Sequence, residues 1–278
     1  MTAKVSSETR ERVEACLKRV EADNKVSILF AVESGSRAWG FPSPDSDYDV
    51  RFVYVRPIDW YLSLTEKRGV IERPIVDDLD VSGWDIKKAL ALLLKGNPAL
   101  LEWLCSPIVY RETEGLAALR TLAERSKHRQ AAAFHYRCLA HNQMKRHILG
   151  RTHVNLKKYL YCIRPAGALL WLRTNKGQVP MDLPTILHGV TLPPSVDAAI
   201  NRLLTMKAEM SELGEGGRIP AIDAFVEQEI AKARTEVPEP PLESTMLITE
   251  AEILFRRLVL TSRSQSPFGM NFGPPTVP

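Results

Sequence analysis

The chain has 278 residues, of which 45% are hydrophobic and 25% are charged, and its formal net charge is +4. This is ample material for the core of one large domain or two modest ones. No apolar run approaches the roughly 20 residues of a membrane span, and the N-terminus lacks the apolar centre of a signal peptide, so a cytoplasmic location is expected. The four cysteines form no C-x-x-C pair, which argues against a zinc site and predicts free thiols.

The sequence of the first part of the chain predicts both helices and strands. Apolar residues at three- and four-residue spacing predict a helix over residues 7–23. Apolar runs predict strands at 25–33 and 48–56, followed by a short helix at 59–64. Residues 67–75 predict a strand that Pro74 confines to a sheet edge. Alternating polar and apolar residues from Asp78 to Ser82 predict a further strand.

The rest of the chain predicts helices almost throughout. Asp85 is a typical cap for a helix over 86–95, and Gly96 is a typical stop. Further helices are expected at 99–105, 129–149, 155–173, 184–188, 195–213, 220–233 and 243–262. Pro165 lies inside one of them and predicts a kink or restart. Residues 263–278 are rich in Ser, Gly and Pro and predict a disordered tail.

The stretch between the first two strands carries the strongest functional signal. Gly35 permits a tight turn, and backbone N–H groups there, together with the hydroxyl of Ser36, could hold a phosphate. Asp47 and Asp49 are two residues apart on the second strand, so their carboxylates share one face and repel each other. A divalent cation with a preference for oxygen ligands, Mg²⁺ or Mn²⁺, would offset that repulsion. Solvated acids in a plain hairpin loop are the alternative.

Gly35-Ser36, ten intervening residues and Asp47-Tyr48-Asp49-Val50 resemble the signature of the polymerase-beta-type nucleotidyltransferase superfamily. The longer string from Glu33 to Arg51 resembles one bacterial branch, the predicted nucleotidyltransferases of the YcgL type, some of which are associated with RNA ligases. The resemblance continues at 82–85, 95–98, 102–104 and 157–160. It implies an α+β fold, with a small mixed β-sheet catalytic domain at 1–110 and an all-helical domain at 111–262.

The resemblance also implies roles for single residues. Asp47 and Asp49 would hold two Mg²⁺ ions, with Mn²⁺ as an alternative, and a third carboxylate from a neighbouring strand would join them. We assign that role to Asp80, with Asp78 on the same face as its competitor. A helical domain in the superfamily lends basic or aromatic residues to the nucleotide, and the candidates are Lys157 and Tyr159, with Lys158 as an alternative. The phosphates of an NTP would be held by Gly35 and Ser36, assisted by Arg37.

Charge is distributed unevenly along the chain. Residues 126–181 contain no Asp or Glu and 11 Lys or Arg, so the remainder has a net charge of −7. Within this span, His135, His141, His147 and His153 recur every six residues, which does not place them on one helix face as zinc ligands would require. A basic region beside a phosphate-handling motif favours a polyanionic substrate.

These features together predict transfer of a nucleoside monophosphate from an NTP to an acceptor hydroxyl. RNA is the preferred acceptor, in end modification or repair, and an RNA ligase or another protein is a further expected partner. A protein adenylyltransferase of the antitoxin type is the enzymatic alternative. A nucleotide sensor or RNA-binding adaptor without catalysis is the alternative from a different class.

Overall fold

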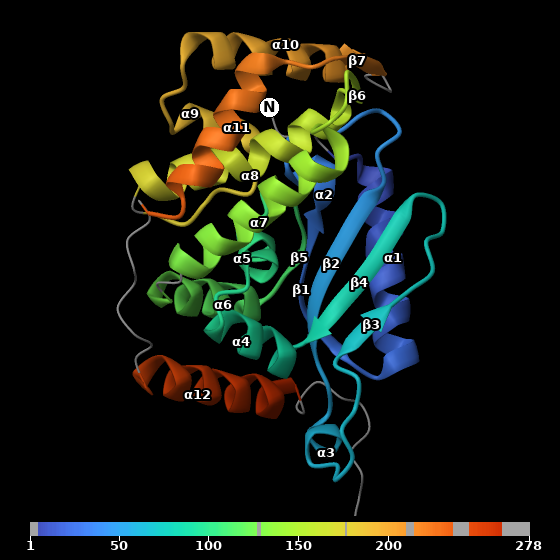
Figure 1. Cartoon of the computed structure of the whole chain (residues 1–278). Helices are drawn as coiled ribbons and strands as arrows, with labels where there is room; N and C mark the ends of the chain where they lie inside the picture. Colours follow the sequence, from blue (N-terminus) through green and yellow to red (C-terminus); the bar gives the residue numbers. More distant parts are fainter. Residues whose placement is uncertain (1–4, 127–128, 176, 210–213, 236–244, 263–278) are drawn as a thin grey trace, which may run out of the picture.

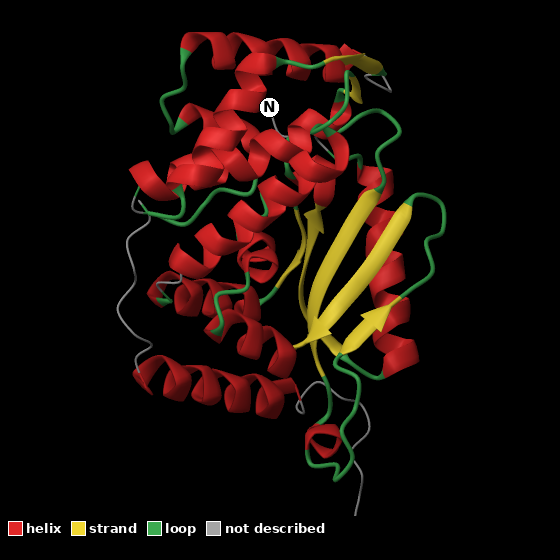
Figure 2. Ribbon diagram, in the orientation of Figure 1, coloured by secondary structure: helices red, strands yellow, loops and turns green. Residues whose placement is uncertain are grey.

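The computed structural model describes residues 5–126, 129–175, 177–209, 214–235 and 245–262. At its centre is a five-stranded sheet in the order β3-β4-β2-β1-β5 (Figures 1 and 2). Strands β2 and β4 are parallel, while the other neighbours are antiparallel, so the sheet is mixed as expected. The strands are β1 (Ser27–Ser34), β2 (Tyr48–Val55), β3 (Val70–Glu72), β4 (Leu79–Asp85) and β5 (Val109–Glu112).

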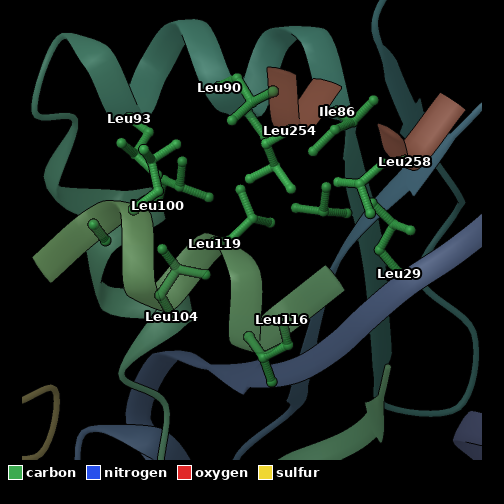
Figure 3. Close-up of a cluster of buried hydrophobic side chains, with 14 of the residues drawn as sticks. Leu29, Ile86, Leu90, Leu93, Leu100, Leu104, Leu116, Leu119, Leu254 and Leu258 are labelled. Carbon is green, nitrogen blue, oxygen red and sulfur yellow. The ribbon is translucent and has the colours of Figure 1, made fainter. Parts of the chain in front are cut away.

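Each face of the sheet is covered by helices because side chains alternate along the strands. Helix α1 (Ser7–Asn24) covers one face, where Val50, Phe52 and Val81 pack against its apolar side. The other face packs against α4 (Ile86–Leu94), α5 (Pro98–Leu104), α6 (Glu114–Arg125) and α12 (Thr245–Ser262) in a leucine-rich cluster (Figure 3). Alternation therefore leaves Asp49, Arg51 and Asp80 on the face opposite α1.

The helices within residues 129–232 form a second layer above the end of the sheet where β1 finishes and β2 begins (Figure 1). They share an apolar cluster that also contains Phe41. The elements are α7 (Arg129–His147), α8 (Lys157–Thr174), α9 (Leu183–His188), α10 (Pro194–Glu209) and α11 (Pro220–Lys232), with a small two-stranded sheet of β6 (His153–Asn155) and β7 (Glu215–Gly217).

A buried arginine joins this layer to the sheet's own helices. The guanidinium of Arg164 on α8 is 3% exposed, and its Nη2 lies 2.9 Å from Oε1 of Glu102 on α5. The same oxygen accepts a hydrogen bond from the hydroxyl of Tyr136 on α7 at 2.9 Å. Removal of one member of a buried ion pair is costly, so this contact fixes how the two layers meet.

Several boundaries differ from the sequence-based expectation. The expected strand at 67–75 is only three residues long, although it does lie at the sheet edge. Pro165 lies within α8, which continues to Thr174 without restarting. Strand β5 was not predicted, because its sequence, Val-Tyr-Arg-Glu, is short and partly polar. The short helix α3 covers Ile58–Tyr61.

The domain boundary at residue 110 remains a prediction, and apolar packing continues past it. Helices α6 and α12, both C-terminal to that position, contribute to the leucine-rich cluster beneath the sheet. The tail expected at 263–278 lies outside the described residues. Among the described residues, no helix combines the length and the apolarity needed to cross a membrane.

Candidate active site

The turn after β1 is pressed against the second strand. Residues Gly35–Ala38 form the short helix α2, and Gly35 has φ +62°, a conformation that side chains disfavour. A Cβ built on Gly35 would lie 2.0 Å from Oδ2 of Asp49. Glycine is therefore required on two grounds, and its absent side chain is what brings the turn into contact with the carboxylate.

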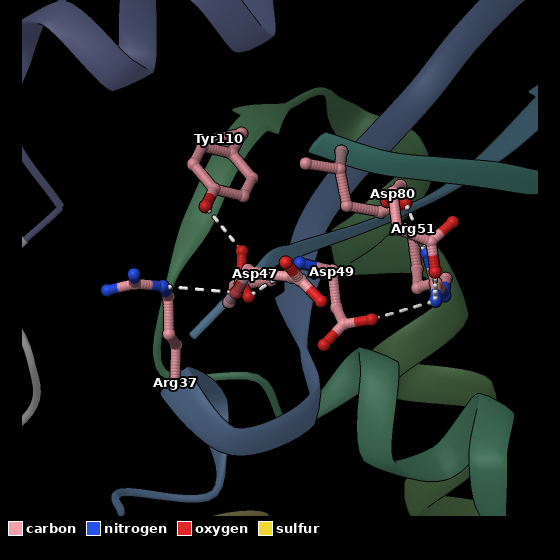
Figure 4. A network of polar contacts seen from close by, with 8 residues as sticks. Arg37, Asp47, Asp49, Arg51, Asp80 and Tyr110 are labelled. Atoms are coloured by element: carbon pink, nitrogen blue, oxygen red, sulfur yellow. Dashed lines mark hydrogen bonds and ion pairs between the residues drawn. The ribbon is translucent and has the colours of Figure 1, made fainter. Parts of the chain in front are cut away.

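Two carboxylates from neighbouring strands converge beside this turn. The parallel register places Asp49 of β2 opposite Asp80 of β4. Between them, Nη2 of Arg51 donates to Oδ1 of Asp49 at 3.0 Å and to Oδ2 of Asp80 at 2.6 Å (Figure 4). Burial raises the pKa of Asp49; Arg51 lowers it, while the charges of Asp80 and Asp47 raise it further. The three aspartates are thus electrostatic neighbours.

The structure separates the two candidates for the third carboxylate. Asp78 precedes β4 in a left-handed conformation, φ +63°, and its Oδ1 lies 3.0 Å from Nη2 of Arg12 on α1. Asp80 lies inside the strand and shares Arg51 with Asp49. The strand begins after Asp78, so the alternation that linked the two aspartates in the sequence stops between them.

A buried glutamate that the sequence reasoning did not select supports Asp49. Glu33 of β1 is fully buried, and its Oε1 accepts a hydrogen bond from the backbone N–H of Asp49 at 2.9 Å. Its other oxygen accepts from the hydroxyl of Tyr110 on β5. Burial raises the pKa of Glu33 to about 7. The sequence signal that could have identified Glu33 is a charged residue within an otherwise apolar strand.

Arg37 has a different contact from the one expected. Its Nε donates to the carbonyl of Asp47 at 3.1 Å (Figure 4). Its Nη2 donates to the carbonyl of Ser46. The guanidinium also lies 3.9 Å from the centroid of the Tyr48 ring. Arg37 is absent from the lining of the pocket described below. Arg37 therefore links α2 to the loop that contains Asp47. Its side chain does not line the pocket in which we expect the phosphates.

A pocket of about 340 Å³ opens above these carboxylates. It is lined by the turn and strand residues and by two side chains of α8. The lining residues are Ser34, Gly35, Ser36, Trp39, Asp45, Ser46, Asp47, Asp49, Arg51, Lys157 and Tyr161. The pocket therefore brings together the Gly-Ser turn, two of the aspartates and Lys157, which are far apart in the sequence.

The expectation that Tyr159 contacts a nucleotide is corrected by its position. Tyr159 is fully buried, and its hydroxyl donates to Oδ1 of Asp223 at 2.9 Å and accepts from the N–H of Ile219. Two residues along a helix face nearly opposite directions, whereas four residues share a side. Lys157 and Tyr161 therefore face the pocket together while Tyr159 faces the core. The i,i+4 spacing from Lys157 was the signal that could have identified Tyr161.

Aromatic residues connect the pocket to the helical layer. The rings of Trp39, Phe41 and Tyr161 lie with their centroids 5.8–6.0 Å apart. The guanidinium of Arg164 lies 4.8 Å from the centroid of Trp39. Tyr161 of the helical layer is thus held in place by its contacts with Trp39 and Phe41, which follow the Gly-Ser turn in the chain.

The carboxylate oxygens at this site are ligands of the kind that a hard divalent cation prefers. Asp49 and Asp80 offer carboxylate oxygens that already converge on one cationic nitrogen, and Asp47 lies next to them. As placed, no three His, Cys, Asp or Glu side chains in the described part of the chain surround a common point. The guanidinium of Arg51 now occupies the position between Asp49 and Asp80, and a cation at that point would replace its contacts.

Similarity to known proteins extends over most of the chain. Residues 9–257 match the RlaP family, described as the RNA repair pathway DNA polymerase beta family. The uncharacterized protein YcgL of Bacillus subtilis is 41% identical over 254 residues, which cover 90% of this chain and 96% of that protein. A nucleotidyltransferase-like protein from Exiguobacterium sibiricum, known from a crystal structure, is 13% identical, with 92% of this chain and 91% of that chain covered and a TM-score of 0.25.

Proposed function

Because the chain belongs to the RNA repair pathway DNA polymerase beta family and is a nucleotidyltransferase, we propose that it transfers a nucleoside monophosphate from an NTP to a hydroxyl of RNA. Pyrophosphate is the second product. One observation carries the proposal: the Gly35-Ser36 turn, Asp47, Asp49 and Lys157 line one pocket, and Asp80 shares the guanidinium of Arg51 with Asp49 beside it. The RNA acceptor is supported by the family's description and by the basic span at 126–181.

The residues divide between the two substrates. The backbone at Gly35 and the hydroxyl of Ser36 would hold the β- and γ-phosphates of the NTP, and Lys157 would offset their charge. Tyr161 takes the aromatic role first expected of Tyr159, because its ring faces the pocket. Arg37 would act indirectly by holding the loop before Asp47.

Asp47, Asp49 and Asp80 would hold two Mg²⁺ ions, with Mn²⁺ as an alternative. When bound, such ions supply charge neutralisation on the phosphates and lower the pKa of the acceptor hydroxyl. Asp80 belongs to the acceptor side, where its carboxylate would orient the hydroxyl and receive its proton. Glu33 would hold Asp49 in place through the backbone N–H.

The bond changes are those of an in-line displacement. The acceptor oxygen forms a bond to the α-phosphorus of the NTP, and the bond from that phosphorus to the β-bridging oxygen breaks. Pyrophosphate leaves with the electron pair. Because positioning and electrostatics supply most of the acceleration in phosphoryl-transfer chemistry, the arrangement of carboxylates around the pocket is the element on which turnover depends.

The test is label transfer from each α-³²P-NTP in the presence of Mg²⁺ or Mn²⁺, total RNA and cell protein. Wild type is compared with Asp47→Asn combined with Asp49→Asn. The matched control is Asp59→Asn combined with Asp77→Asn, which makes the same chemical change at exposed residues that do not line the pocket. We expect wild type and control to label a nuclease-sensitive product and the Asp47/Asp49 variant to label none.

Two outcomes would overturn parts of the proposal separately. Label in a protease-sensitive product would replace RNA with a protein acceptor, as in the antitoxin-type adenylyltransferases. Equal labelling by the Asp47/Asp49 variant and wild type would show that the chemistry takes place elsewhere. Absence of labelling by wild type with every NTP would reject the proposed reaction.

A further inference from the structure

The cations of the acid-free span 126–181 have two different environments. Some serve the fold: Arg164 pairs with Glu102, and Arg173 pairs with Glu229 at 2.9 Å. Others lie at the surface where α7 ends and α8 begins. We call this group the α7–α8 basic patch, and it consists of Arg146, His147, Arg151 and Lys158.

The members of the patch lie close together. Nη2 of Arg151 donates to the carbonyl of Arg146 at 3.1 Å, which places its guanidinium beside the last turn of α7. The pKa of His147 is lowered by burial and then by the charges of Lys158, Arg146 and Arg151. The patch therefore includes residues from both helices within electrostatic range of a single imidazole.

The patch adjoins the pocket. Nζ of Lys158 lies 5.3 Å from the centroid of the Tyr161 ring, and Tyr161 lines the pocket together with Lys157, the neighbour of Lys158 in the chain. A ligand that leaves the pocket past Tyr161 on this side reaches Lys158 first.

The patch lacks the pairing that other surface arginines have. Arg12, Arg68, Arg125 and Arg256 each form an ion pair with a carboxylate. Within the described ranges, no carboxylate forms an ion pair with a member of the α7–α8 basic patch. Clustered like charges repel each other, and a polyanion that binds them gains affinity by releasing its counterions. A stretch of phosphodiesters is the ligand that this chemistry fits.

We propose that the α7–α8 basic patch binds the phosphate backbone of the RNA strand whose terminal hydroxyl enters the pocket. The inference rests on the proposed function, since that function supplies the RNA. Contacts to phosphates position a strand without reading its bases. Binding by the patch would accordingly be independent of RNA sequence, and the single-stranded segment next to the reacting end would lie along the C-terminal turn of α7.

The test measures RNA binding apart from catalysis. Arg146→Gln combined with Arg151→Gln is compared with Arg19→Gln combined with Arg257→Gln, which removes the same charge from exposed positions on α1 and α12. Binding of a fluorescein-labelled 20-nucleotide single-stranded RNA of mixed sequence is followed by anisotropy over a series of KCl concentrations. Thermal unfolding of every variant is recorded as a check on folding.

For the patch variant we expect about tenfold weaker binding at low salt, and a slope of log K against log[KCl] that is shallower by about 1 to 1.5, since each lost contact to a single strand removes about 0.7. The control should stay within about twofold of wild type. Addition of Lys158→Gln should weaken binding further. The unfolding temperature of the patch variant should stay close to that of wild type, because relief of repulsion between like charges offsets the loss of the hydrogen bond from Arg151 to the carbonyl of Arg146.

The outcomes separate this inference from the proposed function. Equal RNA affinity and equal salt slopes in the two double variants would overturn the patch, even if wild type transfers label to RNA. Weaker binding by the patch variant alone would support the patch, even if no transfer is seen. Failure of wild type to bind the RNA, or patch-dependent binding of an acidic polypeptide such as polyglutamate in preference to RNA, would reject RNA as the ligand.

Discussion

Two arginines in this protein make nearly the same contacts in different surroundings. Arg51 and Arg111 are each 17% exposed, and each bridges two carboxylates. Arg111 of β5 pairs with Glu14 and Glu21 of α1, at 2.7 and 2.8 Å. Arg51 pairs with Asp49 and Asp80, which lie on two neighbouring strands.

The difference lies in what surrounds the carboxylates. Glu14 and Glu21 belong to one helix, so Arg111 holds that helix on the sheet and its effect is structural. Asp49 borders a glycine turn and a pocket, and its pKa is raised by burial and by two further aspartates. An arginine–carboxylate contact is therefore informative about function only when its neighbours can receive a ligand.

The largest expected effect is the difference in nucleotidyl transfer between substitutions of Asp80 and of Asp78. Asp80→Asn should lower nucleotidyl transfer roughly 10²- to 10³-fold, because a charge needed in the transition state is lost. Asp78→Asn should remain within about twofold, since Asp78 pairs with Arg12 on α1, whereas Asp80 shares Arg51 with Asp49. Single-turnover rates at saturating NTP measure both. The reverse ranking would move the third carboxylate to Asp78.

Glu33 should give the site region a pH-dependent stability. Its pKa is raised from 4.5 to about 7, so the folded chain retains a proton that the unfolded chain releases. The resulting stability is fully present below pH 4.5 and is lost as pH rises through about 7, by up to about 3 kcal/mol. Urea unfolding without added divalent ions, from pH 4.5 to 8, measures this difference.

Glu33→Gln imitates the protonated carboxyl and should remove that part of the pH dependence. Glu66→Gln, at an exposed glutamate, should leave it unchanged. Parallel curves of unfolding free energy against pH for wild type and Glu33→Gln would contradict the assignment.

Gly35 tests whether close contact between the turn and Asp49 matters. Gly35→Ala would place a Cβ 2.0 Å from Oδ2 of Asp49 and should lower transfer about thirtyfold, through displacement of a carboxylate in the preorganised site. Gly150→Ala is its control, because Gly150 also has a positive φ, +74°, but nothing lies within 4 Å of the added atom.

Both alanine variants should lose about 1 to 2 kcal/mol of unfolding free energy from the left-handed backbone. Only Gly35→Ala should lose activity beyond what that instability explains. Equal activities of the two variants, measured well below their unfolding temperatures, would argue against the contact.

The smallest expected effect concerns the two arginines compared above, Arg51 and Arg111. Arg51→Gln should tighten Mn²⁺ binding about tenfold, because a positive charge within hydrogen-bond distance of Asp49 and Asp80 is removed. Arg111→Gln should leave Mn²⁺ binding unchanged and lower the unfolding free energy by about 1 kcal/mol. Isothermal titration calorimetry and urea unfolding provide the two readouts. Equal Mn²⁺ affinities would show that Arg51 does not compete with the cation.

The strand-turn-strand motif was predictable because its signals are local. Gly35, Asp47 and Asp49 lie within 15 residues, and the apolar runs on either side define the strands. Asp80 followed from the resemblance, but its separation from Asp78 required the start of β4, which alternation alone does not fix. Glu33 was missed because its partner, Tyr110, lies on a strand that was not predicted.

Tyr159 illustrates the limit of helical prediction in this chain. The sequence placed a basic and an aromatic residue near the start of α8, and Lys157 does line the pocket, while its contact with a nucleotide stays a prediction. It did not determine which aromatic residue shared a side with the lysine, because α8 is apolar over most of its circumference and its sequence shows no clear polar face. Packing of α8 against α7 and α11 decides that Tyr161 faces outward.

The parallel pairing of β2 with β4 has a consequence for folding kinetics. Asp49 and Asp80 are 31 positions apart, and parallel strands pair only after the connection between them has crossed over. Such nonlocal contacts are slow to form. A cation that requires both carboxylates therefore binds the finished fold in preference to a chain with only the β1–β2 hairpin. Such a cation would slow unfolding and leave the refolding rate nearly unchanged, so an occupied active site would stabilise the native state kinetically.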